Sequence, residues 1–446
     1  MSGPRSGVDA ARSPSTPMTA PRGGWLLASS ASVVLLLLGS ALSSGPLDTL
    51  TIDLRHRLVV ATATSPAAAP VAPSPRPSAA QTAMQPGVPV PGTAPAAVAG
   101  RAADGLGGGV GVNVFLEQEV EPAKRQRSLE LLRDAGVSWI RQELPWEQIE
   151  PVARGQTTDP NFGGSTWAKF DDIVDRANGL GFNLILRLST SPRWALPTDA
   201  PDGLGPPLNE ADYWDFVSEV ATRYRGKVAA YQVWNEPNLN SEWGRHPPDA
   251  AAYARLLRGA SERIRAADPS ARVLMAALAP TLTENADALN ELVYLQQLYD
   301  AGVRGTFDAL AVQAYGLRGG PDDPRVDPVD VTFSRPLLVR QVMERNGDGA
   351  TPVWATEMGW NVNPPDLPIQ SYGRVTPSLQ ARYTVRAIER VREQWPWMQV
   401  VCIWYWKRPD ETNRNQDWFW FRLADPDFTL QPVYYALRDA ALTGWR

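Results

Sequence analysis

Apolar residues recur along the C-terminal three quarters of the chain in two alternating patterns. Short continuous runs rich in Val, Ile, Leu and Trp indicate buried strands, whereas longer segments with apolar positions every three or four residues indicate helices. The runs predict strands at 110–115, 139–143, 183–189, 229–235, 273–278, 309–315, 353–357 and 400–406. The periodic segments predict helices at 123–135, 167–180, 210–223, 250–267, 289–301, 335–345, 378–395 and 433–441.

The ends of several predicted helices carry matching signals. Thr376 followed by Pro377 suits a helix start, because a threonine can cap the helix and proline is tolerated at the first helical position. Gly136, Gly181 and Gly302 each follow a predicted helix, where a residue in the left-handed conformation is favoured.

Strands that alternate with helices in this way predict a parallel sheet covered by helices. Eight such pairs between residues 109 and 446 fit a closed (β/α)8 TIM barrel in both number and size. An open, doubly wound sheet is the alternative, but it usually carries a glycine-rich phosphate loop after its first strand. Neither G-x-G-x-x-G nor a Walker A sequence is present there. We therefore expect a barrel whose chemistry lies at the carboxyl ends of its strands.

The N-terminal quarter predicts a membrane anchor and a tether. Residues 1–24 hold three arginines against one acid, and the 18 residues Trp25–Leu42 carry no charge. As a helix they would span about 27 Å, enough for a hydrocarbon core. The preceding arginines predict a cytoplasmic N-terminus, so residues 25–43 would be a single-pass anchor with the barrel outside the cell membrane. The alternative is a cleaved signal peptide, which would give a secreted protein.

Residues 44–108 connect this segment to the barrel. Residues 46–60 have the pattern of a short amphipathic juxtamembrane segment. Residues 61–104 consist mainly of Ala, Pro, Ser, Thr and Val with hardly a charge, a composition that buries too little apolar surface to fold. We expect a stiff, disordered linker that holds the barrel away from the membrane.

The overall composition narrows the chemistry. A net charge of −5 and a pI near 5.4 argue against a nucleic-acid partner, which would favour a basic face. Cys402 is the only cysteine and the two histidines are far apart, so a disulfide within the chain is excluded and no metal or cofactor site is expected. The 17 tryptophans exceed an ordinary share, and their flat faces suit stacking on sugars.

The first candidate for catalysis is Glu236. It follows a strand-forming run that begins at Tyr231 and precedes Pro237. Proline disfavours helix in the residue before it, so we expect Glu236 where the fourth strand ends. At the rim of an apolar core its carboxyl would be partly desolvated, which raises a carboxyl pKa toward the value that a general acid needs. The alternative is a solvated glutamate in an ordinary turn.

The second carboxylate is Glu357, at the end of the seventh strand. Simple alternation places Val353, Ala355 and Glu357 on one face, directed into the barrel mouth. Strands four and seven lie opposite each other in an eight-stranded barrel. Carboxylates from both could approach to about 5–5.5 Å, the spacing of a double-displacement glycosidase.

Further residues at strand ends could support this pair. Arg141 could keep a nucleophilic carboxylate ionised, although an ion pair with Glu143 or Glu147 is an alternative. Asn235 could bind a substrate hydroxyl, and Tyr315 could donate to the seventh-strand carboxylate or simply fill the core.

Several tryptophans are candidates for contact with a sugar. Trp404 and Trp406 share one face of the predicted eighth strand, so either could form the floor of a sugar pocket. Four others lie in loops expected at the same rim, as candidate sugar platforms or as loop packing: Trp146, Trp194, Trp243 and Trp360.

Two motifs, Trp234-Asn-Glu-Pro-Asn238 and Trp354-Ala-Thr-Glu-Met-Gly-Trp360, are specific when taken together. With the Arg141 strand, the segment 307–315 and the Trp-rich last strand, they make residues 110–446 resemble the (β/α)8 retaining glycoside hydrolases of clan A. Within that clan the chain is similar to family 39 or to family 5-like proteins.

The resemblance implies that Glu236 is the acid/base and Glu357 the nucleophile. It further implies that Arg141, Asn235, Tyr315 and Trp404 line the site of the reacting sugar. The chain departs from the pattern at Gln313, where such relatives commonly carry a histidine two residues before the tyrosine.

These patterns predict a membrane-tethered retaining glycosidase acting on a polysaccharide or oligosaccharide without a cofactor. A catalytically silent domain that binds or senses carbohydrate is a second hypothesis. A transglycosylase using the same residues is a third, because only the acceptor differs.

Overall fold

The computed structural model describes residues 109–198, 200, 204–367 and 371–444. The segments predicted as cytoplasmic, membrane-spanning and linker lie outside these residues. Within the described ranges, no helix is both long and apolar enough to cross a membrane.

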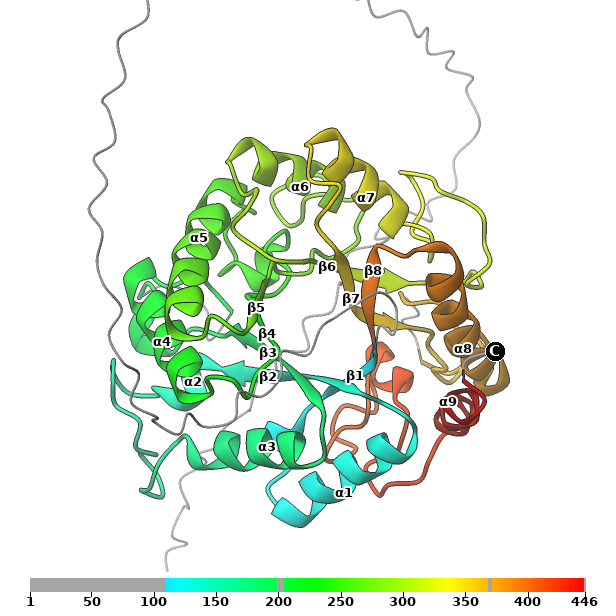
Figure 1. The fold of residues 1–446 in the computed structure, drawn as a ribbon, viewed down its shortest axis with the longest axis horizontal. Coiled ribbons are helices and arrows are strands. Elements are labelled where there is room, and N and C mark those ends of the chain that lie inside the picture. Colours follow the sequence, from blue (N-terminus) through cyan, green and yellow to red (C-terminus); the bar gives the residue numbers. More distant parts are fainter. Residues whose placement is uncertain (1–108, 199, 201–203, 368–370, 445–446) are drawn as a thin grey trace, which may run out of the picture. The chain divides into compact units, whose positions relative to one another are not determined.

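Eight parallel strands form one sheet at the centre of the folded part, in the order β5-β4-β3-β2-β1-β8-β7-β6. The strands are β1 (Val110–Val114), β2 (Trp139–Pro145), β3 (Asn183–Ser189), β4 (Ala230–Val233), β5 (Arg272–Leu274), β6 (Leu310–Tyr315), β7 (Val353–Gly359) and β8 (Met398–Ile403). Figure 1 looks into the ring that they form, with the helices outside it. The predicted (β/α)8 barrel is confirmed.

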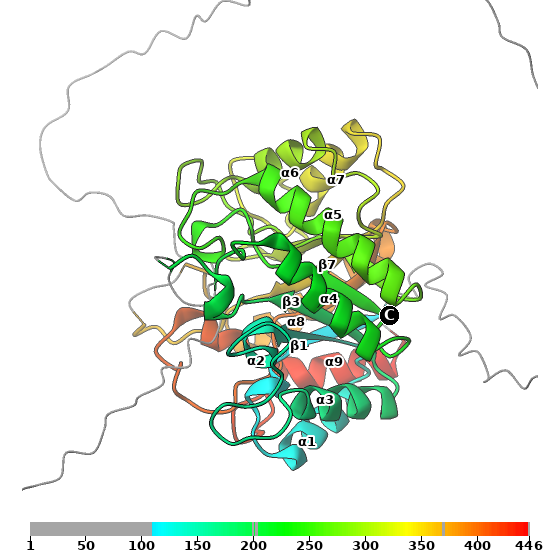
Figure 2. The same cartoon turned by 90° about the vertical axis from the view of Figure 1, so that its left-hand side faces the viewer.

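The helices that cover the barrel follow the strands in sequence, and α4 and α5 lie side by side on its flank (Figure 2). Their bounds are α1 (Pro122–Asp134), α2 (Trp146–Ile149), α3 (Ala168–Gly179), α4 (Glu210–Arg223), α5 (Ala250–Ala267), α6 (Glu291–Asp300), α7 (Pro336–Arg345), α8 (Pro377–Gln394) and α9 (Pro432–Leu442). The predicted helices at 210–223 and 250–267 and the strand at 183–189 agree with the structure residue for residue. The short helix α2 was not predicted.

The capping residues predicted at the ends of several helices are confirmed. The backbone N–H of Leu379 donates to Thr376 Oγ1 over 3.2 Å, so Thr376 caps α8 ahead of Pro377. Gly136 and Gly302 follow α1 and α6 with φ of 74° and 76°, the left-handed values that glycine adopts without a steric penalty.

The barrel closes between β5 and β6 through isolated contacts rather than a continuous ladder. Parallel bridges join Leu274 to Ala309 and Leu278 to Val312. The backbone N–H of Asp308 also donates to the carbonyl of Val273 over 2.8 Å. The predicted strand at 273–278 is shorter in the structure because β5 ends at Leu274.

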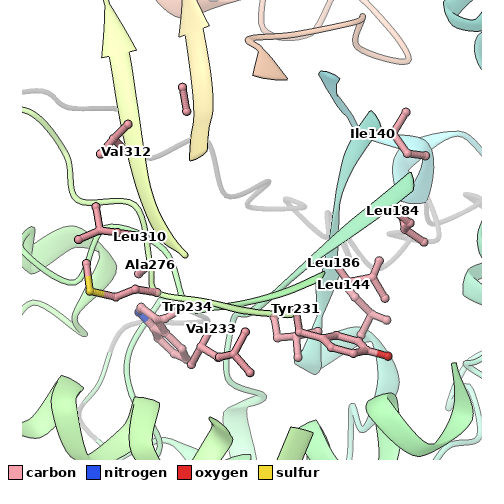
Figure 3. Packing of buried hydrophobic residues seen from close by; sticks show 14 of the residues in the cluster. Ile140, Leu144, Leu184, Leu186, Tyr231, Val233, Trp234, Ala276, Leu310 and Val312 are labelled. Carbon is pink, nitrogen blue, oxygen red and sulfur yellow. The ribbon is translucent and has the colours of Figure 1, made fainter. Parts of the chain in front are cut away.

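Apolar side chains fill two regions, inside the barrel and between the barrel and its helices. The interior group contains Ile185, Ala230, Leu274, Ala309, Trp354, Val400 and the buried cysteine Cys402. Figure 3 shows part of the outer group, with Leu144, Leu186 and Tyr231 among its members. This division identifies the inward and outward positions of each strand.

Strand β7 does not alternate as the sequence suggested. Val353 and Ala355 belong to the outer group and Trp354 to the interior. In the pairing with β6, Val312 faces Ala355 but Gln313 faces Glu357, so β7 holds one extra residue at Thr356. This bulge turns Glu357 to the interior. The assignment of Val353, Ala355 and Glu357 to one face is therefore wrong, although Glu357 does point inward.

Candidate active site

Glu236 lies three residues beyond the end of β4, in a strained stretch of backbone. Trp234 and Glu236 have φ of 70° and 39°, left-handed values that are uncommon outside glycine and that cluster at functional sites. Because of this turn the strand ends at Val233, earlier than predicted. The backbone N–H of Glu236 donates to the carbonyl of Ala277 over 3.1 Å, which fixes the turn against the segment after β5.

The carboxyl group of Glu236 is buried, with the residue 2% exposed. The Gln313 amide Nε2 donates to Glu236 Oε1 over 2.5 Å. Burial raises the pKa of Glu236 well above its ordinary value, and the charges of Glu357 and Glu242 raise it further. A raised pKa favours the protonated form of a carboxyl group, which is the form that a general acid requires.

Glu357 lies within β7 and accepts hydrogen bonds at both carboxylate oxygens. Arg141 Nη1 donates to Oε1 over 2.9 Å, and the Tyr315 hydroxyl donates to Oε2 over 2.7 Å. Two donors, one of them charged, hold the carboxylate of Glu357 in a fixed orientation.

Arg141 connects the two sides of the site. Besides Glu357, its guanidinium donates to Asn113 Oδ1 over 2.7 Å, to Gln232 Oε1 over 2.9 Å and to Asn235 Oδ1 over 3.2 Å. Burial lowers the pKa of Arg141, while the charge of Glu357 acts in the opposite direction. The predicted pairing with Glu357 is thus present, and the alternative partner Glu143 pairs elsewhere.

A second group of buried charges lies beside this one and was not singled out in the sequence. Arg187, on β3, pairs with Glu143, on β2, over 2.5 Å. Glu242 comes from the short helix Asn240–Glu242 after β4 and shares a hydrogen bond with Asn235. Burial raises the pKa of Glu242 to about 8, with Glu143 and Glu357 adding to the rise.

Sequence signals for these additional residues differ in strength. Asn113 and Gln232 are polar residues inside apolar strands at inward positions, a pattern that could have identified them. Tyr372, before α8, also lies near the two carboxyl groups: burial raises its pKa, and the charges of Glu236 and Glu357 raise it further. Glu242 lies in an irregular loop, where no periodicity indicates direction.

Trp404 and Trp406 lie beyond the end of β8 and face different regions. Trp404 packs in an aromatic cluster with Tyr315, and its indole Nε1 is buried without a hydrogen-bond partner among the described residues. Trp406 belongs to the outer core, with its ring centroid 6.0 Å from that of Tyr434 in α9. The structure brings Trp404 to the site and leaves Trp406 outside it, so the two do not share a face.

The tryptophans expected at the rim fill the structure instead. Trp360 is fully buried, and its Nε1 donates to the carbonyl of Gly319 over 2.7 Å. Trp194 is half-buried, and its Nε1 donates to the carbonyl of Glu150 over 2.6 Å. The remaining two, Trp146 and Trp243, are also buried. These contacts are those of loop packing.

The site thus combines a buried carboxyl group with a raised pKa, Glu236, and a second buried carboxyl group, Glu357, that accepts hydrogen bonds from Arg141 and Tyr315. No group of three or more His, Cys, Asp or Glu residues suited to a metal ion occurs in the part of the chain that the structure describes.

Residues 107–291 match the family model described as Cellulase (glycosyl hydrolase family 5), a range that contains Arg141 and Glu236. The resemblance to clan A glycoside hydrolases is confirmed. A search of curated proteins found no match.

Solved structures share the fold at low sequence identity. A family 39 glycoside hydrolase from the gut symbiont Bacteroides cellulosilyticus WH2 is 20% identical with a TM-score of 0.58, covering 74% of this chain and 63% of its own. The family 39 enzyme from Xanthomonas axonopodis pv. citri is 17% identical with a TM-score of 0.52, covering 74% and 65%. A family 5 subfamily 18 protein from Streptomyces cattleya, solved with GlcNAc, is 16% identical with a TM-score of 0.54, covering 76% and 80%.

The match therefore spans less than two thirds of the length of the two family 39 proteins. These solved structures share the barrel fold with this chain.

Proposed function

We propose that the chain is a retaining glycosidase that hydrolyses a polysaccharide or oligosaccharide by double displacement. The observation that carries this proposal is that two buried carboxyl groups, which interact electrostatically, lie in different environments. Glu357 accepts from Arg141 and Tyr315, whereas the pKa of Glu236 is raised by burial and by Glu357. Pairs of carboxyl groups with opposed environments divide the acid and nucleophile roles between them.

In the first step a Glu357 oxygen attacks the anomeric carbon while Glu236 transfers its proton to the glycosidic oxygen. The bond from the anomeric carbon to that oxygen breaks, which leaves a glycosyl ester on Glu357 and a free leaving alcohol. In the second step Glu236, now ionised, takes a proton from water as the water oxygen attacks the anomeric carbon. The ester bond breaks, the sugar leaves with its original configuration, and both carboxyl groups return to their starting states.

The surrounding side chains support these steps. Arg141 and Tyr315 hold Glu357 in place, and Asn235, tied to Arg141, lies next in sequence to the acid. Trp404 offers an indole N–H without a partner among the described residues, a donor for a sugar hydroxyl. The indole N–H of Trp406 is also buried without a partner among the described residues, but its ring packs in the outer core against Tyr434. The indole N–H groups of Trp360 and Trp194 already donate to backbone carbonyls.

The alternative of a silent carbohydrate-binding domain is less well supported. A domain that only binds sugar has no need to bury a second carboxyl and pair it with Arg141 and Tyr315, because a buried ion pair costs desolvation free energy. Transglycosylation uses the same two carboxyl groups and would differ in the acceptor alone.

Covalent trapping tests the proposal. The full chain would be incubated with activated 2-deoxy-2-fluoro glycosides of the gluco, galacto, manno and xylo series, digested and analysed by mass spectrometry. A fluoroglycosyl adduct on Glu357, absent from Glu357→Gln, is the expected result. An adduct on another residue would reassign the nucleophile, and full hydrolytic activity in Glu357→Gln would refute the mechanism.

We also propose that residues 25–43 anchor the chain in the cell membrane with the barrel outside. The support is the uncharged run Trp25–Leu42 and the arginines before it. Fractionation after an alkaline wash tests this: the chain should stay with the membrane, and deletion of 25–42 should leave it in the cytoplasm. A shortened mature chain in the culture medium would indicate a cleaved signal peptide instead.

A further inference from the structure

Strand β6 contacts both carboxyl groups of the site. Its inward residues Gln313 and Tyr315 are two positions apart and thus share a face. Gln313 donates to Glu236 over 2.5 Å, and Tyr315 donates to Glu357 over 2.7 Å. One strand therefore sets the position of the acid and of the nucleophile together.

The direction of the hydrogen bond from Gln313 assigns the oxygens of Glu236. An amide N–H donates and cannot accept, so Oε1 of Glu236 is an acceptor in this contact. The proton of the neutral acid then resides on Oε2. We propose that Gln313 is a positioning residue that reserves Oε2 of Glu236 for proton transfer and presents its own amide oxygen to a donor on the bound substrate. This inference rests on the proposed function.

The amide oxygen of Gln313 supplies the second part of the argument. Gln313 is 5% exposed, and this oxygen is buried without a hydrogen-bond partner among the described residues. A buried acceptor without a partner is unfavourable, because it has lost its hydrogen bonds to water. A hydroxyl group of the bound sugar, or the water of the second step, would satisfy it. A donor held there lies beside the acid, where the leaving group departs and the water enters.

The bulge on β7 is what brings these groups into register. Because Thr356 is the extra residue, Gln313 stands opposite Glu357 rather than opposite Thr356. Gln313 therefore lies beside Glu357 in the sheet, and it is hydrogen-bonded to Glu236, which follows β4. A change at Gln313 should alter acid catalysis without removing either donor to Glu357.

Gln313 also acts on the protonation of Glu236. Its N–H favours the ionised form and lowers the pKa, against the larger effect of burial. The other titratable or charged groups that interact with Glu236 include Glu357 on β7, Glu242 after β4, Arg187 on β3, Tyr315 on β6 and Tyr372 before α8. Loss of the Gln313 donor leaves these in place, so the pKa of Glu236 should rise.

The test compares Gln313→Met with Gln380→Met. Gln380 is a matched control because it is also a buried glutamine with an unpartnered oxygen, but its Nε2 donates to the backbone carbonyls of Trp360 and Phe421. Met has nearly the volume of Gln and removes both donor and acceptor. Unfolding midpoints of the two variants separate loss of stability from loss of function.

Two kinetic readouts are expected in Gln313→Met and not in Gln380→Met. With alkyl glycosides, which need a proton on the leaving oxygen, kcat/KM should fall about 100-fold. With dinitrophenyl glycosides, which leave without protonation, it should change less than about threefold. The basic limb of the kcat/KM profile should move to higher pH. Gln313→His, which restores an N–H donor, should recover part of the loss.

A measurement without turnover keeps the inference separate from the proposed function. Carbon-13 labelling of glutamate carboxyl groups and NMR titration, with the Glu236 signal assigned by Glu236→Gln, reads the pKa of Glu236 directly. A higher pKa in Gln313→Met than in the wild type supports the positioning role even if every glycoside tested is inert, which would count against hydrolysis alone. An unchanged pKa, or equal losses with both classes of leaving group, would overturn the inference.

Discussion

Arg141 and Glu357 form an ion pair with 2.9 Å between nitrogen and oxygen, and their side chains are 3% and 4% exposed. Removal of one partner leaves an uncompensated charge in the core, which costs about 3–5 kcal/mol. We therefore expect Arg141→Met to lower the free energy of unfolding by about that amount, measured by urea titration of tryptophan fluorescence. The double variant with Glu357→Gln should lose less than the sum of the two single variants, because neither charge remains unpaired. Additive losses would show that the pair is not coupled.

Tyr315→Phe removes the other donor to Glu357. A hydrogen bond to a charged group contributes about 1.5–3 kcal/mol, so the variant should be less stable by that order and should form the glycosyl ester more slowly. The matched control is Tyr231→Phe, because the Tyr231 hydroxyl is buried without a partner among the described residues. That control should be neutral or slightly stabilising. Equal losses in the two variants would contradict a specific role for the Tyr315 hydroxyl.

Stability should fall as pH rises from 5 to 8. Burial raises the pKa of Glu117, in the short helix Leu116–Gln118 after β1, to about 7 and that of Glu242 to about 8. The folded chain therefore retains two protons at pH values where the same glutamates of the unfolded chain, with a pKa near 4.5, have released them. Stability linked to these protons is present below the unfolded pKa and is lost as pH rises through the folded pKa. Between its unfolded and its folded pKa, each group changes the free energy of unfolding by about −1.4 kcal/mol per pH unit.

Glu242→Gln should remove one such contribution, visible as a shallower decline in urea unfolding free energies at pH 5, 6.5 and 8. The exposed residue Glu262 provides the control, Glu262→Gln, which should follow the wild type. A wild-type stability that rises across this range would show that the buried carboxyl groups are ionised throughout.

Trp404 and Trp406 provide a matched pair for sugar contact. Trp404→Phe removes the unpartnered indole N–H near Tyr315, and a lost hydrogen bond to substrate of about 1 kcal/mol corresponds to a roughly fivefold lower kcat/KM. Trp406→Phe also removes a buried indole N–H without a partner among the described residues, but in the outer core beside Tyr434, so it should change the unfolding midpoint rather than kcat/KM. The reverse outcome would place Trp406 in the sugar site.

Most strands and helices of the barrel could be predicted because the apolar pattern within each segment and the residues at its ends indicate the same element. The helix that starts after Thr376 is an example, since cap, proline and amphipathic pattern coincide there. Strand β7 shows where such rules fail. Alternation along one strand cannot reveal a bulge, because the extra residue at Thr356 is defined by pairing with β6. The inward direction of Glu357 was therefore predicted from an alternation that the strand does not keep.

The two carboxyl groups could be found from the sequence because each lies in a specific motif near the end of a strand. Arg187 and Glu242 could not, because their meeting depends on how the loop after β4 folds back toward β3. The rim tryptophans were misleading for a related reason. Position in a loop does not imply exposure, and Trp360 is covered by Phe333 and Tyr383.

The contact between β5 and β6 lies between the segment that carries Glu236 and the strand that carries Gln313. Everywhere else neighbouring strands of the barrel are joined by ladders, but here a few bridges such as that of Leu274 with Ala309 complete the ring. Amide protons along this seam should exchange with solvent sooner than those of β2 and β3, since local opening begins where fewest hydrogen bonds must break. Each such opening would break the hydrogen bond from Gln313 to Glu236 while leaving Arg141 and Tyr315 on Glu357, so the surroundings of Glu236 should be disordered at a lower temperature than those of Glu357.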